Sequence, residues 1–374
     1  MTAPNDSCSS IENSSPALGH SRDHTSNLFS CAYSDMQGAT ASQTVRTKDV
    51  PGSTDTVSLP DLTIAGDQKH SVKLGELTKA SITVDGKLRD VYLHVPKNYD
   101  PSKPMPLLVV FNGLGEGARG MENFTKLGEK AEKEGFIVAY PDGSGMQHSW
   151  NTDQSLASSA NDIKFASQVI DSLSQDLNVD ISRVSMAGFS QGGAFALRAA
   201  NALSEKVAAV ASVGGYMTGT EQQANNPLPE LSIVHTQDNL VPFDGTSGLE
   251  SRVKQDWDRH DFGQMAADGA LLVASKLGNH FESAQYTTDS YRRLNGMEGQ
   301  KGRISEHGNY TTAVWDNPTN HTQVEQITVN APRGWDGSSM DKPLYEKNGT
   351  TTSDTDILWD FLKDKTRQNK IFSY

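Results

Sequence analysis

Short apolar runs alternate with amphipathic segments along residues 107–237, and this alternation constrains the fold more than any other feature of the sequence. The run LLVVF at 107–111 is apolar throughout, and FIVAY, VAAVASV and LSIV further along are apolar or nearly so. Such runs are typical of strands that are buried on both faces. Between them, 121–135 and 161–177 carry apolar residues at helical spacing. The pattern predicts a mostly parallel sheet with helices on both faces.

A glycine-flanked serine lies at one of the predicted strand-to-helix turns. Residues 187–195 read AGFSQGGAF, and they place Ser190 between a predicted strand at 183–187 and a predicted helix at 191–204. The pattern G-x-S-x-G in this context is that of a nucleophile elbow, a strained turn that exposes the hydroxyl at the head of a helix. A glycine-rich turn with an incidental serine is the alternative. The strand–turn–helix context favours a nucleophile.

A nucleophilic serine needs a base and an acid that orients the base, and on this kind of sheet they follow the serine in the order acid, then histidine. Asp238 comes directly after the predicted strand at 231–237. Its carboxylate is therefore expected at the same edge of the sheet as Ser190. Asp244 is the second choice, because its position beside Gly245 is more typical of a turn.

The remaining segments add elements at both ends of this sheet. The stretch at 80–95 predicts two strands joined at Asp85-Gly86. Residues 309–330 predict two more strands around a turn that contains a proline, and 353–365 predict a last helix. Residues 243–300 interrupt the alternation with a charged, partly helical insertion, expected over the sheet edge or the site entrance.

The first 75 residues differ in composition from the rest of the chain. They are rich in Ser, Thr, Asn, Asp, Gly and Pro and have no helical or strand periodicity. Such a segment buries too little apolar surface to offset its ordering entropy, so we expect a flexible polar tail at 1–75 and one folded domain at 76–374. An address for a specialised secretion machine is the alternative reading of the tail.

Composition excludes several classes of partner. The formal net charge is −13 over 374 residues, which argues against a nucleic-acid-binding surface. No apolar run approaches the roughly 20 residues of a membrane span, and the start lacks the pattern of a signal peptide. The two cysteines lie within the first 31 residues, and the histidines are scattered. The sequence therefore predicts no disulfide in the domain, no metal and no cofactor.

Six segments occur together in a recognisable order. They read PLLVVFNGLGEG, EGFIVAYPDG, SWN, NDIKFASQVIDSL, RVSMAGFSQGGAFALRAA and HTQDNLVPFDG. In this order the chain resembles the polyhydroxybutyrate depolymerase-like esterases, a group of α/β-hydrolases that includes feruloyl and acetylxylan esterases. The resemblance covers roughly residues 80–245. It implies the α/β-hydrolase fold, hydrolysis of a polyester or plant-type ester, and secretion, here by a route without a cleavable signal; a cytoplasmic location is the alternative.

The resemblance also implies a role for particular residues. The site would hold Ser190 as nucleophile, Asp238 as acid, the backbone N–H groups of Leu114 and Gln191 as oxyanion hole, and Trp150 and Trp335 against the substrate.

The chain departs from this family at the catalytic histidine. The family has a G-H-x-W-P-G-like loop after the last strand, whereas this chain reads NAPRGWDG, with Arg333 in the place of the histidine. A guanidinium with a pKa above about 12 cannot accept the serine proton. Two functions stay open: an esterase whose base comes from elsewhere, or a lapsed hydrolase that binds a ligand or a protein partner.

Four histidines compete to replace the missing base. If 309–316 and 322–330 pair about their turn, His307 lies opposite Ala331, beside the loop of Arg333, and is the favoured base. His321 lies at the turn, more than about 25 Å from the catalytic edge. His280 lies in the insertion, and His235 is expected to be a structural residue of its strand.

Overall fold

The computed structural model describes residues 72–153, 160–238, 240–246, 249–261, 263, 265, 269, 280–337, 345–347 and 350–367. The predicted polar tail lies outside the described residues except for its last four positions.

A ten-stranded mixed sheet has the order β1-β2-β4-β3-β5-β6-β7-β10-β9-β8. The six strands from β4 to β10 in this order run parallel, with β1 and β2 antiparallel at one end and β9 and β8 antiparallel at the other. The predicted parallel sheet is confirmed. The strands are β1 Leu77–Val84, β2 Lys87–His94, β3 Met105–Phe111, β4 Ile137–Pro141, β5 Val179–Phe189, β6 Ala209–Val213, β7 Glu230–His235, β8 Arg303–His307, β9 Tyr310–Asn317 and β10 Thr322–Val329; β11 Tyr345–Lys347 pairs separately with β12 Thr350–Thr352.

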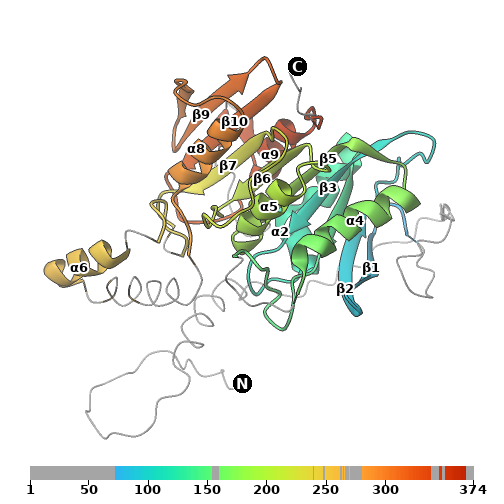
Figure 1. The fold of residues 1–374 in the computed structure, drawn as a ribbon, viewed down its shortest axis with the longest axis horizontal. Coiled ribbons are helices and arrows are strands. Elements are labelled where there is room, and N and C mark those ends of the chain that lie inside the picture. Colours follow the sequence, from blue (N-terminus) through green and yellow to red (C-terminus); the bar gives the residue numbers. More distant parts are fainter. Residues whose placement is uncertain are drawn as a thin grey trace, which may run out of the picture. The chain divides into compact units, whose positions relative to one another are not determined.

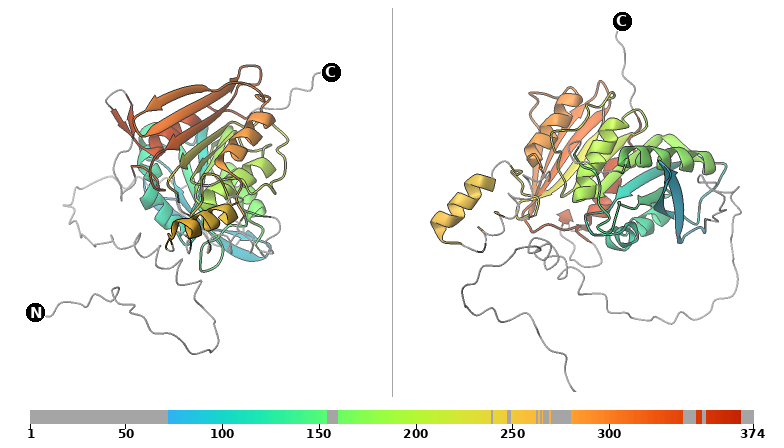
Figure 2. Two further views of the ribbon diagram at one scale, coloured as in Figure 1. Left: turned by 90° about the vertical axis from the view of Figure 1, so that its left-hand side faces the viewer. Right: turned by 60° about the horizontal axis from the view of Figure 1, so that its bottom comes forward.

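Helices cover both faces of the sheet because successive side chains of a strand point to opposite faces. Leu107, Val109 and Phe111 pack in one apolar cluster with α4, α5 and α8, whereas Leu108 and Val110 pack in another with α2, α3 and α9. The two layers are visible on either side of the sheet in Figures 1 and 2. The helices are α2 Ala118–Thr125, α3 Leu127–Glu134, α4 Asp162–Asp176, α5 Gln191–Ala202, α6 Leu249–Arg259, α8 Ala284–Leu294 and α9 Asp354–Leu362.

Local turn and cap signals agree with the sequence. The β1–β2 hairpin turns at Asp85 and Gly86, whose φ angles of 49° and 77° are those of a type I′ turn. Helix α4 begins after Asn161, whose side chain accepts a hydrogen bond from Lys164 N at 3.1 Å.

Two predicted segments differ in the structure. The single helix expected at 121–135 is two helices, α2 and α3, because Lys126 has a left-handed φ of 59° between them. The expected insertion at 243–300 contains α8, which packs against β7 and β10 and buries Tyr291 in the cluster of α4 and α5. Part of that range therefore belongs to the helix layer of the sheet.

Candidate active site

Ser190 adopts a strained backbone between β5 and α5. Its φ of 60° and ψ of −126° are unusual for a residue with a side chain, and such conformations cost about 1–3 kcal/mol each. The Ser190 N–H donates to Val213 O at 2.8 Å, which ties the turn to the end of β6. The turn is therefore held at the carboxyl edge of the parallel strands.

The two glycines of the turn permit this strain. A β-carbon at Gly188 would lie 2.1 Å from Gly192 O, and one at Gly192 would lie 2.2 Å from Phe111 O. Both neighbours are backbone atoms that cannot move aside. Only glycine fits at either position, so the G-x-S-x-G pattern reflects a real steric requirement.

The loop after β3 reaches the serine. A β-carbon at Gly113 would lie 3.4 Å from Ser190 Cβ. Buried Asn112 fastens this loop: its Nδ2 donates to Gly113 O and to His148 O, each at 2.8 Å. The segment that carries Leu114 thus approaches the head of α5. The oxyanion hole formed by N–H groups of Leu114 and Gln191 stays a prediction that this arrangement accommodates.

Asp238 follows β7 and is buried. Its Oδ1 accepts from Leu240 N at 2.8 Å and from Val241 N at 2.9 Å. Its Oδ2 accepts no hydrogen bond from any described residue. In a serine hydrolase this second oxygen is the one that would orient the base.

Arg333 lies beside that free oxygen. Its Nη1 is 3.7 Å from Asp238 Oδ2, and its Cζ lies 5.1 Å from the ring centroid of Phe189, the residue before the serine. The loop after β10 thus brings a guanidinium to the acid at the position where the resemblance would put an imidazole.

Comparison with known proteins finds similar proteins for the part of the chain that carries this arrangement. The family model described as phospholipase/carboxylesterase matches residues 99–277. Feruloyl esterase B of Piromyces equi is 28% identical over 282 residues, covering 74% of this chain and 45% of that protein. Over these residues the chain is similar to carboxylesterases and feruloyl esterases, and its sheet has the α/β-hydrolase fold.

Two further relatives match shorter stretches of this α/β-hydrolase. The bifunctional acetylxylan esterase/xylanase of Neocallimastix patriciarum is 29% identical over 164 residues, which cover 44% of this chain and 23% of that protein. Feruloyl esterase C of Emericella nidulans is also 29% identical over 164 residues, covering 42% of this chain and 57% of that protein. The chain therefore spans between 23% and 57% of the lengths of these three relatives. The family match ends before Arg333.

The structure does not bring His307 to the site of the α/β-hydrolase. His307 lies on β8, the outermost strand, and its ring stacks on Tyr310 with centroids 5.0 Å apart. Strand β8 is the fifth strand from β5 in the sheet order, and at about 4.8 Å per strand this separates them by about 24 Å. The placement argues against the expectation that His307 is the base.

A tight turn explains this difference. The expectation extended β9 backwards so that His307 faced Ala331. Instead the chain reverses at residues 308–309, and His307 pairs with Tyr310 across the turn. Tyr310 in turn pairs with Val329. The extra strand carries His307 to the far side of β9.

Two other histidines are also unsuited to act as the base: His235 is enclosed, and His321 is remote from the serine. His235 is fully buried at the end of β7, with Nε2 3.5 Å from Asp336 Oδ2. This agrees with a structural residue. His321 has a φ of 54° at the turn between β9 and β10, where Asn317 pairs with Thr322. It lies at the end of β10 opposite the loop of Arg333.

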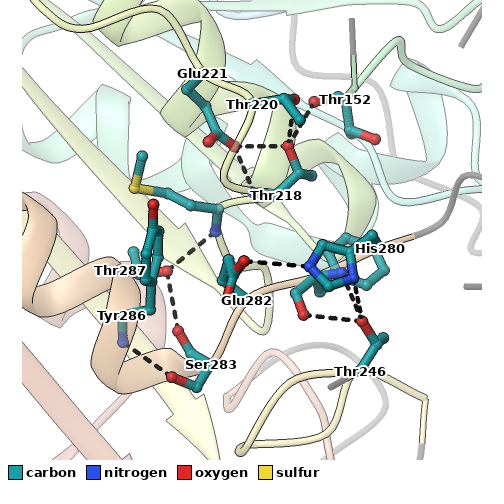
Figure 3. A network of polar contacts seen from close by, with 12 residues as sticks. Thr152, Thr218, Thr220, Glu221, Thr246, His280, Glu282, Ser283, Tyr286 and Thr287 are labelled. Carbon is teal, nitrogen blue, oxygen red and sulfur yellow. Dashed lines mark hydrogen bonds and ion pairs between the residues drawn. The ribbon is translucent and has the colours of Figure 1, made fainter. Parts of the chain in front are cut away.

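His280 belongs to a separate polar network (Figure 3). Its Nδ1 lies 2.8 Å from Thr246 Oγ1, and its Nε2 lies 3.2 Å from Glu282 Oε1. Both ring nitrogens therefore have partners away from Asp238. Within the described part of the chain, no imidazole forms a hydrogen bond with Asp238.

The two tryptophans expected to contact substrate are buried. Trp150 is 3% exposed, stacks on Phe195 at 4.8 Å, and donates from Nε1 to Asn112 O at 3.0 Å. Trp335 is 1% exposed and donates to Thr355 Oγ1 at 2.9 Å. In this structure both side chains support the loops of the site rather than line it.

A histidine that the sequence analysis did not consider lies beside the β3 loop. His148 Nδ1 is 2.9 Å from Asp142 Oδ1, and the backbone of His148 is strained, with a φ of 45°. A β-carbon at Gly117 would lie 3.5 Å from the His148 ring. The SWN segment, one of the six that carry the resemblance, begins one residue later. Its position next to His148 is the feature of the sequence that could have pointed to this histidine.

Two further titratable groups adjoin the site. Burial raises the pKa of Glu116, two residues after Leu114, to about 7. Ionisation of Glu116 near neutral pH would place a negative charge on the loop after β3, beside the predicted oxyanion hole. Tyr216 is fully buried with no hydrogen-bond partner for Oη among the described residues, and its burial and the Asp238 carboxylate raise the pKa of Tyr216.

Two other kinds of feature do not occur among the described residues. No helix there has the length and apolar character needed to cross a membrane. No group of three or more metal-ligating side chains occurs in the same residues.

Proposed function

We propose that the chain is a serine carboxylic-ester hydrolase of the feruloyl or acetylxylan esterase type. The strained backbone of Ser190 is the observation that supports this most, because an incidental serine has no need of a φ of 60° enclosed by obligatory glycines. The matched relatives are named as feruloyl and acetylxylan esterases, which favours plant-type esters over a polyester. The same names lend no support to a lapsed hydrolase.

In the proposed reaction, Ser190 Oγ attacks the carbonyl carbon of the ester. The new C–O bond forms as the carbonyl electron pair moves to oxygen, and the N–H groups of Leu114 and Gln191 stabilise the resulting oxyanion. Collapse of this intermediate breaks the ester C–O bond, leaves an acyl group on Ser190, and releases the alcohol, which takes up the proton that was removed from Ser190. Water then hydrolyses the acyl-enzyme and releases the acid.

The proton of Ser190 needs an acceptor other than Arg333. Asp238 Oδ2 is buried and accepts no hydrogen bond from the described residues. We assign the proton to this oxygen, relayed by one water molecule. A carboxylate is a weaker base than an imidazole near neutral pH, so the turnover number should be low for this family.

Substitution of the nucleophile tests the proposal. Ser190→Ala should abolish hydrolysis of a 4-nitrophenyl ester and labelling by a fluorophosphonate, whereas Ser102→Ala, on the exposed 101–103 turn, should leave both unchanged. Asp238→Asn preserves shape and removes the basic oxygen, so it should lower kcat at least about 100-fold. Wild-type rates of hydrolysis in Ser190→Ala would refute the assignment of Ser190 as nucleophile. Loss of hydrolysis in His148→Ala, together with unchanged hydrolysis in Asp238→Asn, would identify His148 as the base instead.

A further inference from the structure

The side chain of Arg333 is largely enclosed, and its charge is paired with that of Asp238. Its side chain is 11% exposed, and it donates no hydrogen bond to any described residue. The separation of 3.7 Å from Asp238 Oδ2 is an ion-pair distance beyond that of a hydrogen bond. The five N–H donors of this guanidinium are therefore available to an acceptor that water or a ligand supplies.

The position of Arg333 relates it directly to Ser190. The guanidinium lies over the ring of Phe189, which precedes the serine. A β-carbon at Gly214 would lie 3.5 Å from Arg333 Nε, and one at Gly215 would lie 2.3 Å from Ser190 O. Two adjacent glycines thus lie against the guanidinium at one position and against the backbone of the serine at the next.

Asp238 pairs with the charge of Arg333 but accepts no hydrogen bond from its guanidinium. Backbone N–H groups of Leu240 and Val241 already bind Asp238 Oδ1. The chain carries a formal net charge of −13, so its general field repels anions. An anion that binds near Ser190 must therefore do so through a specific cation, and the planar guanidinium fits a carboxylate with two parallel hydrogen bonds.

We propose that Arg333 binds a free carboxylate of the substrate, so that the preferred substrates are esters carrying a second, ionised carboxyl group. This inference rests on the proposed ester hydrolysis at Ser190. It gives Arg333, which stands where the resemblance places a histidine, a role in selecting the substrate. The neutral ester of the same length, which lacks the carboxylate, leaves the guanidinium donors without this acceptor when it binds.

Two matched esters test the assignment: the mono-4-nitrophenyl ester of glutaric acid and 4-nitrophenyl valerate. They share the scissile bond and the chain length and differ in the terminal carboxylate. We expect wild-type kcat/KM to favour the glutarate ester by about tenfold or more, as for a hydrogen-bonded charge. Arg333→Gln should lower this ratio at least about tenfold, and Arg333→Lys, which keeps the charge without the fork, should give an intermediate ratio.

Arg293→Gln is the matched control, because Arg293 is an exposed arginine paired with Glu298 on the surface. It should leave the ratio unchanged. A wild-type ratio near one, or a ratio that Arg333→Gln and Arg333→Lys leave unchanged, would overturn the proposal.

Calorimetric binding of glutarate separates this proposal from the proposed hydrolysis. Glutarate should bind wild type and Ser190→Ala alike and should bind Arg333→Gln at least about tenfold more weakly. If neither ester is hydrolysed but this binding pattern holds, the ester hydrolysis fails and the carboxylate site stands. Equal binding of glutarate by wild type and Arg333→Gln would refute the site.

Discussion

Glu230 should make the stability of the fold depend on pH. This carboxyl group lies at the start of β7 with no exposed surface, and its Oε2 has no partner among the described residues. Burial is the largest effect on the pKa of Glu230; a hydrogen bond from Ser232 opposes it, the Glu325 charge adds to it, and the result is a rise from 4.5 to about 8. The folded state therefore holds the proton more tightly than the unfolded state.

The sign and size of the effect follow from linkage. The stabilisation is fully present below pH 4.5, where both states are protonated, and it is lost as the pH rises through about 8. A pKa difference of about 3.5, at 1.36 kcal/mol for each pKa unit, corresponds to about 5 kcal/mol. Glu230→Gln removes the ionisation and keeps the acceptor for Ser232.

Urea unfolding of wild type and Glu230→Gln at several pH values measures the effect. The two free energies of unfolding should differ least near pH 4.5. Their difference should shift by up to about 5 kcal/mol in favour of the glutamine variant by pH 9. The control is Glu298→Gln, whose glutamate side chain is 76% exposed, so its difference from wild type should not change with pH. A constant difference for Glu230→Gln would refute the buried, protonated carboxyl.

Two further predictions concern the site. His307→Ala should keep ester hydrolysis within about twofold of wild type because β8 lies five strands from β5, and steady-state kinetics measure this; a loss on the scale of Ser190→Ala would contradict the sheet order. Gly192→Ala should destabilise the fold by about 1–3 kcal/mol and reduce kcat at least about 100-fold, because the new β-carbon would lie 2.2 Å from Phe111 O. Thermal unfolding and kinetics test both parts, and an active, equally stable variant would show that the turn can relax.

The sequence was sufficient wherever neighbouring residues decide the conformation. The type I′ turn at Asp85 and Gly86, the cap at Asn161 and the G-x-S-x-G turn all depend on groups within a few positions of one another. The apolar runs likewise indicated the parallel strands, because burial on both faces leaves its mark on each strand separately. The fold class and the strained Ser190 followed from these local patterns.

Contacts between distant segments were decided by the tertiary structure alone. The reversal at 308–309 inserted β8 and moved His307 to the outer edge, although the pairing of β9 with β10 was expected. The burial of Trp150 depends on Phe195, which lies more than 40 positions along the chain. No periodicity in the sequence encodes which strand borders another or what covers an indole ring.

Arg333 illustrates both what the sequence could indicate and what only the tertiary structure decided. The sequence indicated that an arginine replaces the expected histidine, because that comparison needs only the residues of one loop. Its 3.7 Å separation from Asp238 and its place over Phe189 depend on the loops that follow β10 and β7 and on the last residue of β5. These loops converge only because their strands lie parallel and near one another in the sheet, and hydrogen bonds between segments far apart in the chain create that arrangement.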